Sequence, residues 1–125
     1  MRNTRATQLV GDLLRVHARP LSVQELHEQV EARLPSTAYS TVYRIVGRLE
    51  AAGRVRRVDW RERGSRYEWA ELPHHHHIVC GLCGRSVDID DADLGFSEER
   101  VRAATGFQIN HHTIELEGIC PDCRR

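Results

Sequence analysis

Hydrophobic residues recur at helical spacing three times in the first half of the chain. The first repeat stops before Pro20, which cannot continue a helix. The second opens with Ser22 and Glu25, the pattern of a capping box, and the third closes at Gly53, a residue typical of helix C-termini. The predicted helices span residues 4–17, 22–34 and 37–53.

The segment 54–70 predicts a β-hairpin, because apolar residues flank arginines, "RERG" suits a turn and "SRYEWA" suits a returning strand. Three helices and a hairpin form the order of a winged helix-turn-helix, whose third helix enters the DNA major groove. An ordinary solvated helix face is the alternative reading. The outward residues of this helix that could reach phosphates or bases are Ser40, Thr41, Tyr43, Arg44 and Arg48.

The second half begins with four consecutive histidines in "HHHHIVC", residues 74–80, which we predict to be a strand. Side chains alternate between the two faces of a strand, so His74 and His76 share one face. His75 and His77 share the other. Two pairs on opposite faces suit two separate metal sites, although a solvated polar strand with unliganded histidines has the same pattern.

After this strand, the sequence predicts a short strand over 86–90 and a helix within 91–105. One or two strands are expected over 107–119, a segment that contains His112 as a further candidate ligand. The predicted class is α+β, a winged helix followed by an α/β domain. The predicted divisions are a DNA-binding domain 1–70, a hinge 71–73 and a metal-binding domain 74–125.

Two Cys-x-x-Cys pairs carry the strongest chemical signal. Cys80 and Cys83 form one pair, and Cys120 and Cys123 form the other. Each pair can offer two thiolates to one tetrahedral ion, and four thiolates make a closed site typical of structural zinc. A closed site leaves no position for water and so argues against hydrolysis. Redox-active thiol pairs are the alternative.

Charge is distributed unevenly along a chain whose formal net charge is zero. Residues 1–66 contain 13 arginines and 7 acidic residues, a net +6, whereas residues 67–125 contain 5 and 11, a net −6. No stretch approaches the roughly 20 apolar residues that cross a bilayer, and no signal-peptide core is present. We therefore expect a cytoplasmic protein without a membrane partner, whose reduced thiols favour metal over disulfides.

The segments "STVYRIVGRLEAAGRV" (40–55), "HHHHIVCGLCG" (74–84) and "HHTIELEGICPDC" (111–123) resemble the ferric uptake regulator (Fur) family of metal-sensing bacterial repressors. The resemblance covers almost the whole chain. It implies a homodimer with a C-terminal α/β dimerisation domain. It also implies binding to double-stranded DNA with an inverted-repeat operator, in an arrangement that metal stabilises.

The resemblance assigns residues to four roles. Cys80, Cys83, Cys120 and Cys123 match the ligands of a structural zinc. Glu68, His75 and His77 match a regulatory site at the hinge. His74, His76 and His112 match an additional site in the dimerisation domain. Tyr43 and Arg44 match the DNA-reading pair, beside Ser40 and Thr41, and Arg2 matches a basic residue for the minor groove.

Several positions depart from the family pattern and leave the fourth ligands of both non-cysteine sites open. Pro20 stands where many members have a histidine. Zinc-sensing relatives often have a cysteine where this chain has Ala70 and an aspartate where it has Arg56. Gly95 stands where the additional site has an acid. The candidate replacements are His17, Asp59, Asp88, Asp93, Glu98 and Glu99.

The histidine run resembles zinc uptake regulators most closely, so zinc-responsive control of metal-uptake genes is the favoured function. Imidazole also suits Fe²⁺, Mn²⁺ and Ni²⁺, and Asp88 matches an aspartate of peroxide-sensing members. Two alternatives belong to other functional classes: a zinc enzyme with Glu68 as its base, and a purely structural zinc protein. No catalytic motif or small-molecule pocket signature supports an enzyme, and metal-dependent DNA binding would separate the classes.

Overall fold

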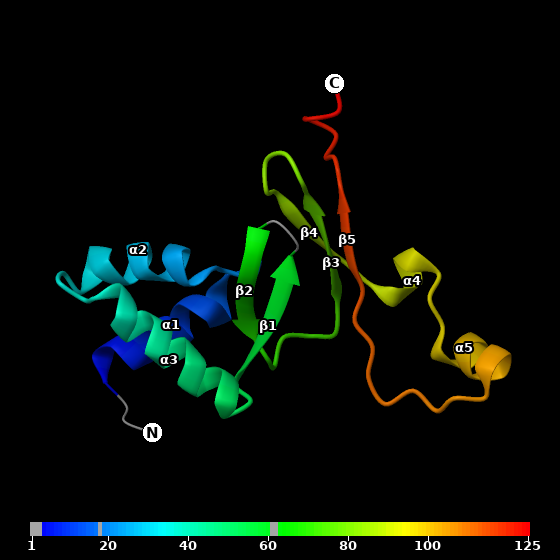
Figure 1. Ribbon diagram of the computed structural model, residues 1–125, viewed down its shortest axis with the longest axis horizontal. Coiled ribbons are helices and arrows are strands. Elements are labelled where there is room, and N and C mark those ends of the chain that lie inside the picture. The colour runs from blue at the N-terminus through cyan, green and yellow to red at the C-terminus, as the bar shows by residue number, and fades with distance from the viewer. Residues whose placement is uncertain (1–3, 18, 61–62) are drawn as a thin grey trace. The chain divides into compact units, whose positions relative to one another are not determined.

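The computed structural model describes residues 4–17, 19–60 and 63–125. The chain divides into two compact units, Met1–Leu72 and Pro73–Arg125 (Figure 1). Within the described residues, no helix has the length and apolar character needed to cross a membrane.

The N-terminal unit contains the three predicted helices and the predicted hairpin. The capping box is confirmed: the backbone N–H of Glu25 donates to Ser22 Oγ at 3.1 Å, and the backbone N–H of Ser22 donates to Glu25 Oε1 at 2.9 Å. The strands pair antiparallel from Val55↔Trp69 to Trp60↔Gly64. The elements are α1 (Arg5–Val16), α2 (Val23–Arg33), α3 (Tyr39–Ala51), β1 (Val55–Trp60) and β2 (Gly64–Trp69).

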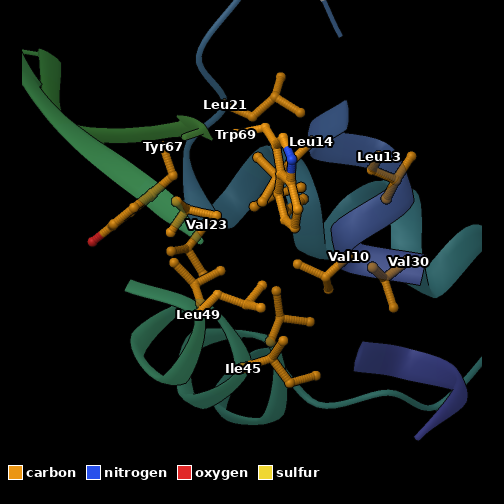
Figure 2. Packing of buried hydrophobic residues seen from close by; sticks show 14 residues of the cluster. Val10, Leu13, Leu14, Leu21, Val23, Val30, Ile45, Leu49, Tyr67 and Trp69 are labelled. Atoms are coloured by element: carbon orange, nitrogen blue, oxygen red, sulfur yellow. The ribbon is translucent and has the colours of Figure 1, made fainter. Parts of the chain in front are cut away.

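One hydrophobic core holds this unit together, with Leu14, Ile45 and Trp69 among its buried members (Figure 2). Helix α3 buries Val42, Ile45, Val46 and Leu49, which lie three and four residues apart and therefore share one face. Its opposite face is left outward, so the helix predicted to read DNA is anchored by one face alone.

The C-terminal unit is built on a three-stranded sheet with the order β4-β3-β5. β4 runs antiparallel to β3, whereas β5 runs parallel to it. A parallel neighbour needs a crossover connection, and the segment that carries both helices supplies it. The elements are β3 (His76–Cys80), β4 (Ser86–Ile89), α4 (Asp91–Leu94), α5 (Glu98–Thr105) and β5 (Glu115–Gly118).

One prediction for this unit was wrong in detail, and two others were less specific than the structure. The strand predicted over 74–80 begins at His76. The helix predicted within 91–105 is two helices, because Gly95 takes a left-handed φ of 67° that ends α4 and Ser97 caps α5. Of the one or two strands expected over 107–119, one forms, Glu115–Gly118.

Candidate metal centres

The four cysteines form one cluster at the end of the parallel strand pair. Cys80 is the last residue of β3, and Cys120 follows β5 by two residues. Parallel strands end at the same edge of a sheet, so both Cys-x-x-Cys turns begin there. All four Sγ atoms lie within 4.8 Å of one another.

Backbone N–H groups prepare Cys80 as a thiolate. The N–H groups of Cys120 and Cys83 donate to Cys80 Sγ at 3.4 and 3.5 Å, and these bonds lower the pKa of its thiol to about 6. The hydrogen bond from Cys123 to Cys120 raises the pKa of the Cys123 thiol to about 12. Four converging sulfurs thus retain a proton unless a cation balances their charge, which fits a four-thiolate zinc site.

His75 and His77 point their Nε2 atoms at each other, 3.1 Å apart. Each ring is oriented through its other nitrogen: His77 Nδ1 lies 2.8 Å from Glu115 Oε1, and His75 Nδ1 lies 2.5 Å from the carbonyl oxygen of Pro73. Carbonyl and carboxylate oxygens only accept, so both Nδ1 atoms carry the proton. The Nε2 atoms are thus the nitrogens left to ligate an ion, and they face each other at hydrogen-bond distance.

This histidine pair has the geometry of two metal ligands. Metal–nitrogen bonds of about 2.0–2.1 Å in a tetrahedron put two nitrogens roughly 3.3 Å apart. Asp88, which pairs with His77 across β3 and β4, places Oδ1 4.0 Å from His77 Nε2. Asp88 is thus the candidate fourth ligand that the sheet places beside this pair.

The remaining hinge-site candidates belong to the N-terminal unit. Glu68 lies opposite Arg56 in the hairpin, with Arg56 Nη2 3.4 Å from Glu68 Oε1. His17 Nε2 lies 3.2 Å from Gln29 Oε1, and Asp59 accepts a hydrogen bond from Ser65 at 2.6 Å. The assignment of Glu68 to one site with His75 and His77 stays a prediction.

A second histidine cluster lies on the opposite face of β3, which confirms the predicted alternation of faces. His74, His76 and His112 all direct Nε2 at the carboxylate of Asp91, at 3.2, 2.5 and 2.9 Å respectively. The ligand atoms of these four residues lie within 4.8 Å of one another. Three imidazoles and one carboxylate are a donor set that fits a divalent cation.

Asp91 was missed from the sequence, where the acid was sought around Gly95. The antiparallel pairing His76↔Ile89 puts Asp91, two residues beyond Ile89, opposite His74. Antiparallel pairing of the two predicted strands, 74–80 and 86–90, would therefore have indicated this acid. Among the proposed replacements, Glu98 accepts a hydrogen bond from the remote His112 Nδ1 at 2.7 Å. In the part of the chain that the structure describes, Asp93 and Glu99 do not belong to the cluster.

Hydrogen bonding shifts two pKa values in this cluster. Bonds from His76 and His112 lower the pKa of Asp91 to about 2, and the bonds to Asp91 and Glu98 raise the pKa of His112 above its ordinary 6.5. His76 differs from His112, because its Nδ1 accepts the Ile114 backbone N–H at 3.0 Å, whereas His112 Nδ1 lies beside the Glu98 carboxylate. Its Nε2 therefore carries the proton and donates to Asp91.

The candidate DNA-binding residues lie on the outward face of α3. Tyr43 is 60% exposed, and Ser40, Arg44 and Arg48 are also exposed. Thr41 was expected to point outward but is half-buried. Arg2 lies outside the described residues.

Comparisons with known proteins agree with these features. A family model described as "Ferric uptake regulator family" matches residues 1–117. The chain is 31% identical over 107 residues to a ferric uptake regulation protein of Campylobacter jejuni, covering 86% of this chain and 68% of that protein. It is 26% identical over 104 residues to the peroxide operon regulator of Bacillus subtilis, covering 83% and 71% of the two chains.

Solved structures show the same fold. The Helicobacter pylori ferric uptake regulator matches with a TM-score of 0.91 at 25% identity, covering 100% of this chain and 83% of that chain. FurB of M. tuberculosis, a zinc uptake regulator, matches with a TM-score of 0.54 at 32% identity, covering 96% and 93%.

We predict that Cys80→Ser loses tightly held zinc and destabilises the C-terminal unit, because structural zinc contributes directly to folding free energy. Metal analysis of the purified protein and thermal unfolding measure the two effects. Ala103→Ser on exposed α5 is the control and should retain the metal. Full zinc content and an unchanged melting temperature in Cys80→Ser would refute a structural metal at this cluster.

A second prediction concerns pH. The raised pKa of His112 means that its contacts stabilise the fold below pH 6.5, and that this contribution is lost as pH rises through the folded-state pKa. The pKa of Asp91 is lowered to about 2, so its contacts stabilise the fold above pH 3.8, its ordinary pKa. This stabilisation is lost as pH falls towards 2. With chelator present, the melting temperature should therefore fall as pH rises above about 6.5.

Asp91→Asn should flatten this dependence, because it removes the charge that raises the His112 pKa. Asp93→Asn is the matched control, since the Asp93 side chain is exposed on the same helix outside the cluster. Equal pH profiles for wild type and Asp91→Asn would show that the cluster does not govern stability in this range.

Proposed function

The chain belongs to the ferric uptake regulator family, and from that premise we propose that it is a zinc-responsive transcriptional repressor of metal-uptake genes. The family consists of metal-responsive transcriptional regulators, with an N-terminal DNA-binding domain and a C-terminal dimerisation domain, that bind DNA and act as dimers. The observation that carries the proposal is the facing pair of Nε2 atoms in His75 and His77, 3.1 Å apart. Regulation, not catalysis, is the activity we assign.

The donor atoms favour zinc. Sulfur and imidazole nitrogen make up the thiol cluster and most of both histidine clusters. Such donors bind zinc more tightly than Mn²⁺ or Fe²⁺, which gain relatively more from oxygen ligands. The likeness to a zinc uptake regulator of M. tuberculosis supports the same choice. We assign the thiol cluster a structural zinc and the His75–His77 pair the sensed zinc.

We further propose that Glu68 completes the sensed site. Glu68 belongs to the N-terminal unit, and His75 and His77 belong to the C-terminal unit. An ion bound by all three would favour one orientation of the domains, and such differential affinity is what a metal switch requires. The ion would have to replace the Arg56–Glu68 ion pair, which should raise the zinc concentration at which the switch responds.

The DNA and dimer surfaces follow from the two units. Residues 1–66 carry the net positive charge, and α3 presents Tyr43 and Arg44 outward. On the sheet of the C-terminal unit, Val87, Ile78 and Leu116 align across three strands and are 37–47% exposed. We assign this apolar row to the contact with a second copy of the chain. A two-fold dimer would then require a DNA site with an inverted repeat.

Peroxide- or iron-responsive regulation is the second candidate. Asp88 adds an oxygen donor 4.0 Å from His77 Nε2, and oxygen ligands favour Fe²⁺ or Mn²⁺ relative to zinc. The likeness to the peroxide operon regulator of Bacillus subtilis supports this alternative.

Metal-dependent DNA binding tests the function. A duplex selected from a random library with the zinc-loaded protein is titrated at fixed ionic strength, because phosphate contacts make affinity salt-dependent. Zn²⁺ should activate binding at a lower free concentration than Mn²⁺ or anaerobic Fe²⁺. His75→Ala should abolish activation, and His74→Ala, on the other face of β3, should affect it less. Activation by Fe²⁺ or Mn²⁺ at lower concentrations than zinc would favour the second candidate, and metal-independent binding would refute both.

Arg44→Ala should weaken binding to the selected duplex by roughly 1–3 kcal/mol, the usual loss for one base or phosphate contact. Fluorescence anisotropy at fixed salt measures this loss. Arg102→Ala removes an exposed charge from the C-terminal unit and serves as the control. An Arg44→Ala variant with wild-type affinity would remove Arg44 from the DNA-binding surface.

A further inference from the structure

We propose that Glu115 is a positioning residue that holds His77 ready for metal and sets the affinity of the His75–His77 centre. This inference deepens the proposed function and rests on it. Glu115 is the first residue of β5 and pairs in register with His77 on β3. Its two carboxylate oxygens lie 2.8 and 3.1 Å from His77 Nδ1.

The contact acts through the histidine ring. A carboxylate accepts and cannot donate, so it keeps a proton on Nδ1 and leaves Nε2 as the nitrogen that can ligate an ion. The two ring nitrogens point in opposite directions, so the Glu115 carboxylate on Nδ1 does not ligate an ion held at Nε2. A carboxylate in this position also makes an imidazole a more basic ligand.

The neighbouring histidine shows that this arrangement is not a general consequence of the strand. His76 Nδ1 accepts the backbone N–H of Ile114, the residue directly before Glu115. Ile114 and Glu115 therefore hold His76 and His77 in opposite tautomers. Nδ1 of His76 is thus already engaged as an acceptor, whereas Nδ1 of His77 holds the proton that a ligating imidazole keeps.

The tautomers predict which of the two histidine centres binds zinc more tightly. The His75–His77 pair has both Nδ1 atoms engaged as donors, which orients both Nε2 atoms towards one point. In the centre around Asp91, His76 instead has Nδ1 engaged as an acceptor and donates to Asp91 from Nε2. The His75–His77 centre should therefore fill at the lower free zinc concentration, with Glu115 as one cause.

The test measures zinc affinity on the full chain, with the thiol cluster loaded, by competition with a chromogenic chelator. Loss of an outer carboxylate of this kind typically costs 10–100-fold in metal affinity. Glu115→Ala should weaken the tighter histidine centre by about that factor. Glu115→Gln keeps an acceptor oxygen but loses the charge, so it should restore part of the affinity.

Glu98→Ala is the matched control, because it removes the carboxylate on His112 Nδ1 in the other centre. It should weaken the second binding event and leave the first unchanged. Co²⁺ absorption spectra and thiol-bound zinc content, measured on each variant, distinguish positioning from unfolding.

Wild-type affinity of the tighter centre in Glu115→Ala would overturn this inference alone. Equal weakening of both centres, or loss of the thiol-bound zinc, would also overturn it by showing a general structural defect. If the wild-type protein binds only the thiol-bound zinc, both this inference and the proposed function fail.

Discussion

The parallel pairing of β3 with β5 is the contact on which all the candidate centres of the C-terminal unit depend. It brings Cys120 and Cys123 to Cys80 and Cys83, and it sets Glu115 beside His77. The chain just before β5 carries His112 to the opposite face. Residues separated by 38 positions thus meet because one strand returns parallel to another, at one fixed register.

The alternation of side chains along β3 then separates the chemistry. One face presents His75 and His77 and the other presents His74 and His76, so a single run of imidazoles supplies two centres. His76 and His77 are 0% and 2% exposed, and buried polar groups need hydrogen-bond partners. Asp91 and Glu115 supply those partners, one on each face. Asp91, Glu98 and Glu115 are thus acidic residues of this half of the chain whose carboxylates orient imidazoles.

The features that could be predicted from the sequence are those that depend on the local pattern of residues. The three helices of the N-terminal unit, its hairpin and the Ser22–Glu25 capping box follow from spacing within a few residues. The two faces of the histidine run follow from strand geometry. The parallel course of β5 did not follow, because periodicity within a strand does not state its partner.

The partners of the imidazoles escaped sequence reasoning for the same reason. Asp91 reaches its cluster through the antiparallel register of β4, and Glu115 reaches His77 through β5. The family pattern pointed to Gly95, which instead ends α4. An acidic residue at one position of the chain can replace an acidic residue at another when the backbone brings both positions near the same point. Matching a sequence to a family position by position does not detect such a replacement.

The junction between the units bears directly on how a metal could act as a switch. Pro73 is the first residue of the C-terminal unit, and its carbonyl oxygen lies 2.5 Å from His75 Nδ1. The orientation of a candidate ligand is therefore tied to the backbone at the point where the two units join. If metal affinity depends on that backbone conformation, then bound metal must bias the same conformation by an equal free energy, because linkage is reciprocal. A coupling of about 1–3 kcal/mol is typical of such systems. The hydrogen bond between His75 and Pro73 therefore links the geometry of a candidate ligand to the chain at the junction of the two units.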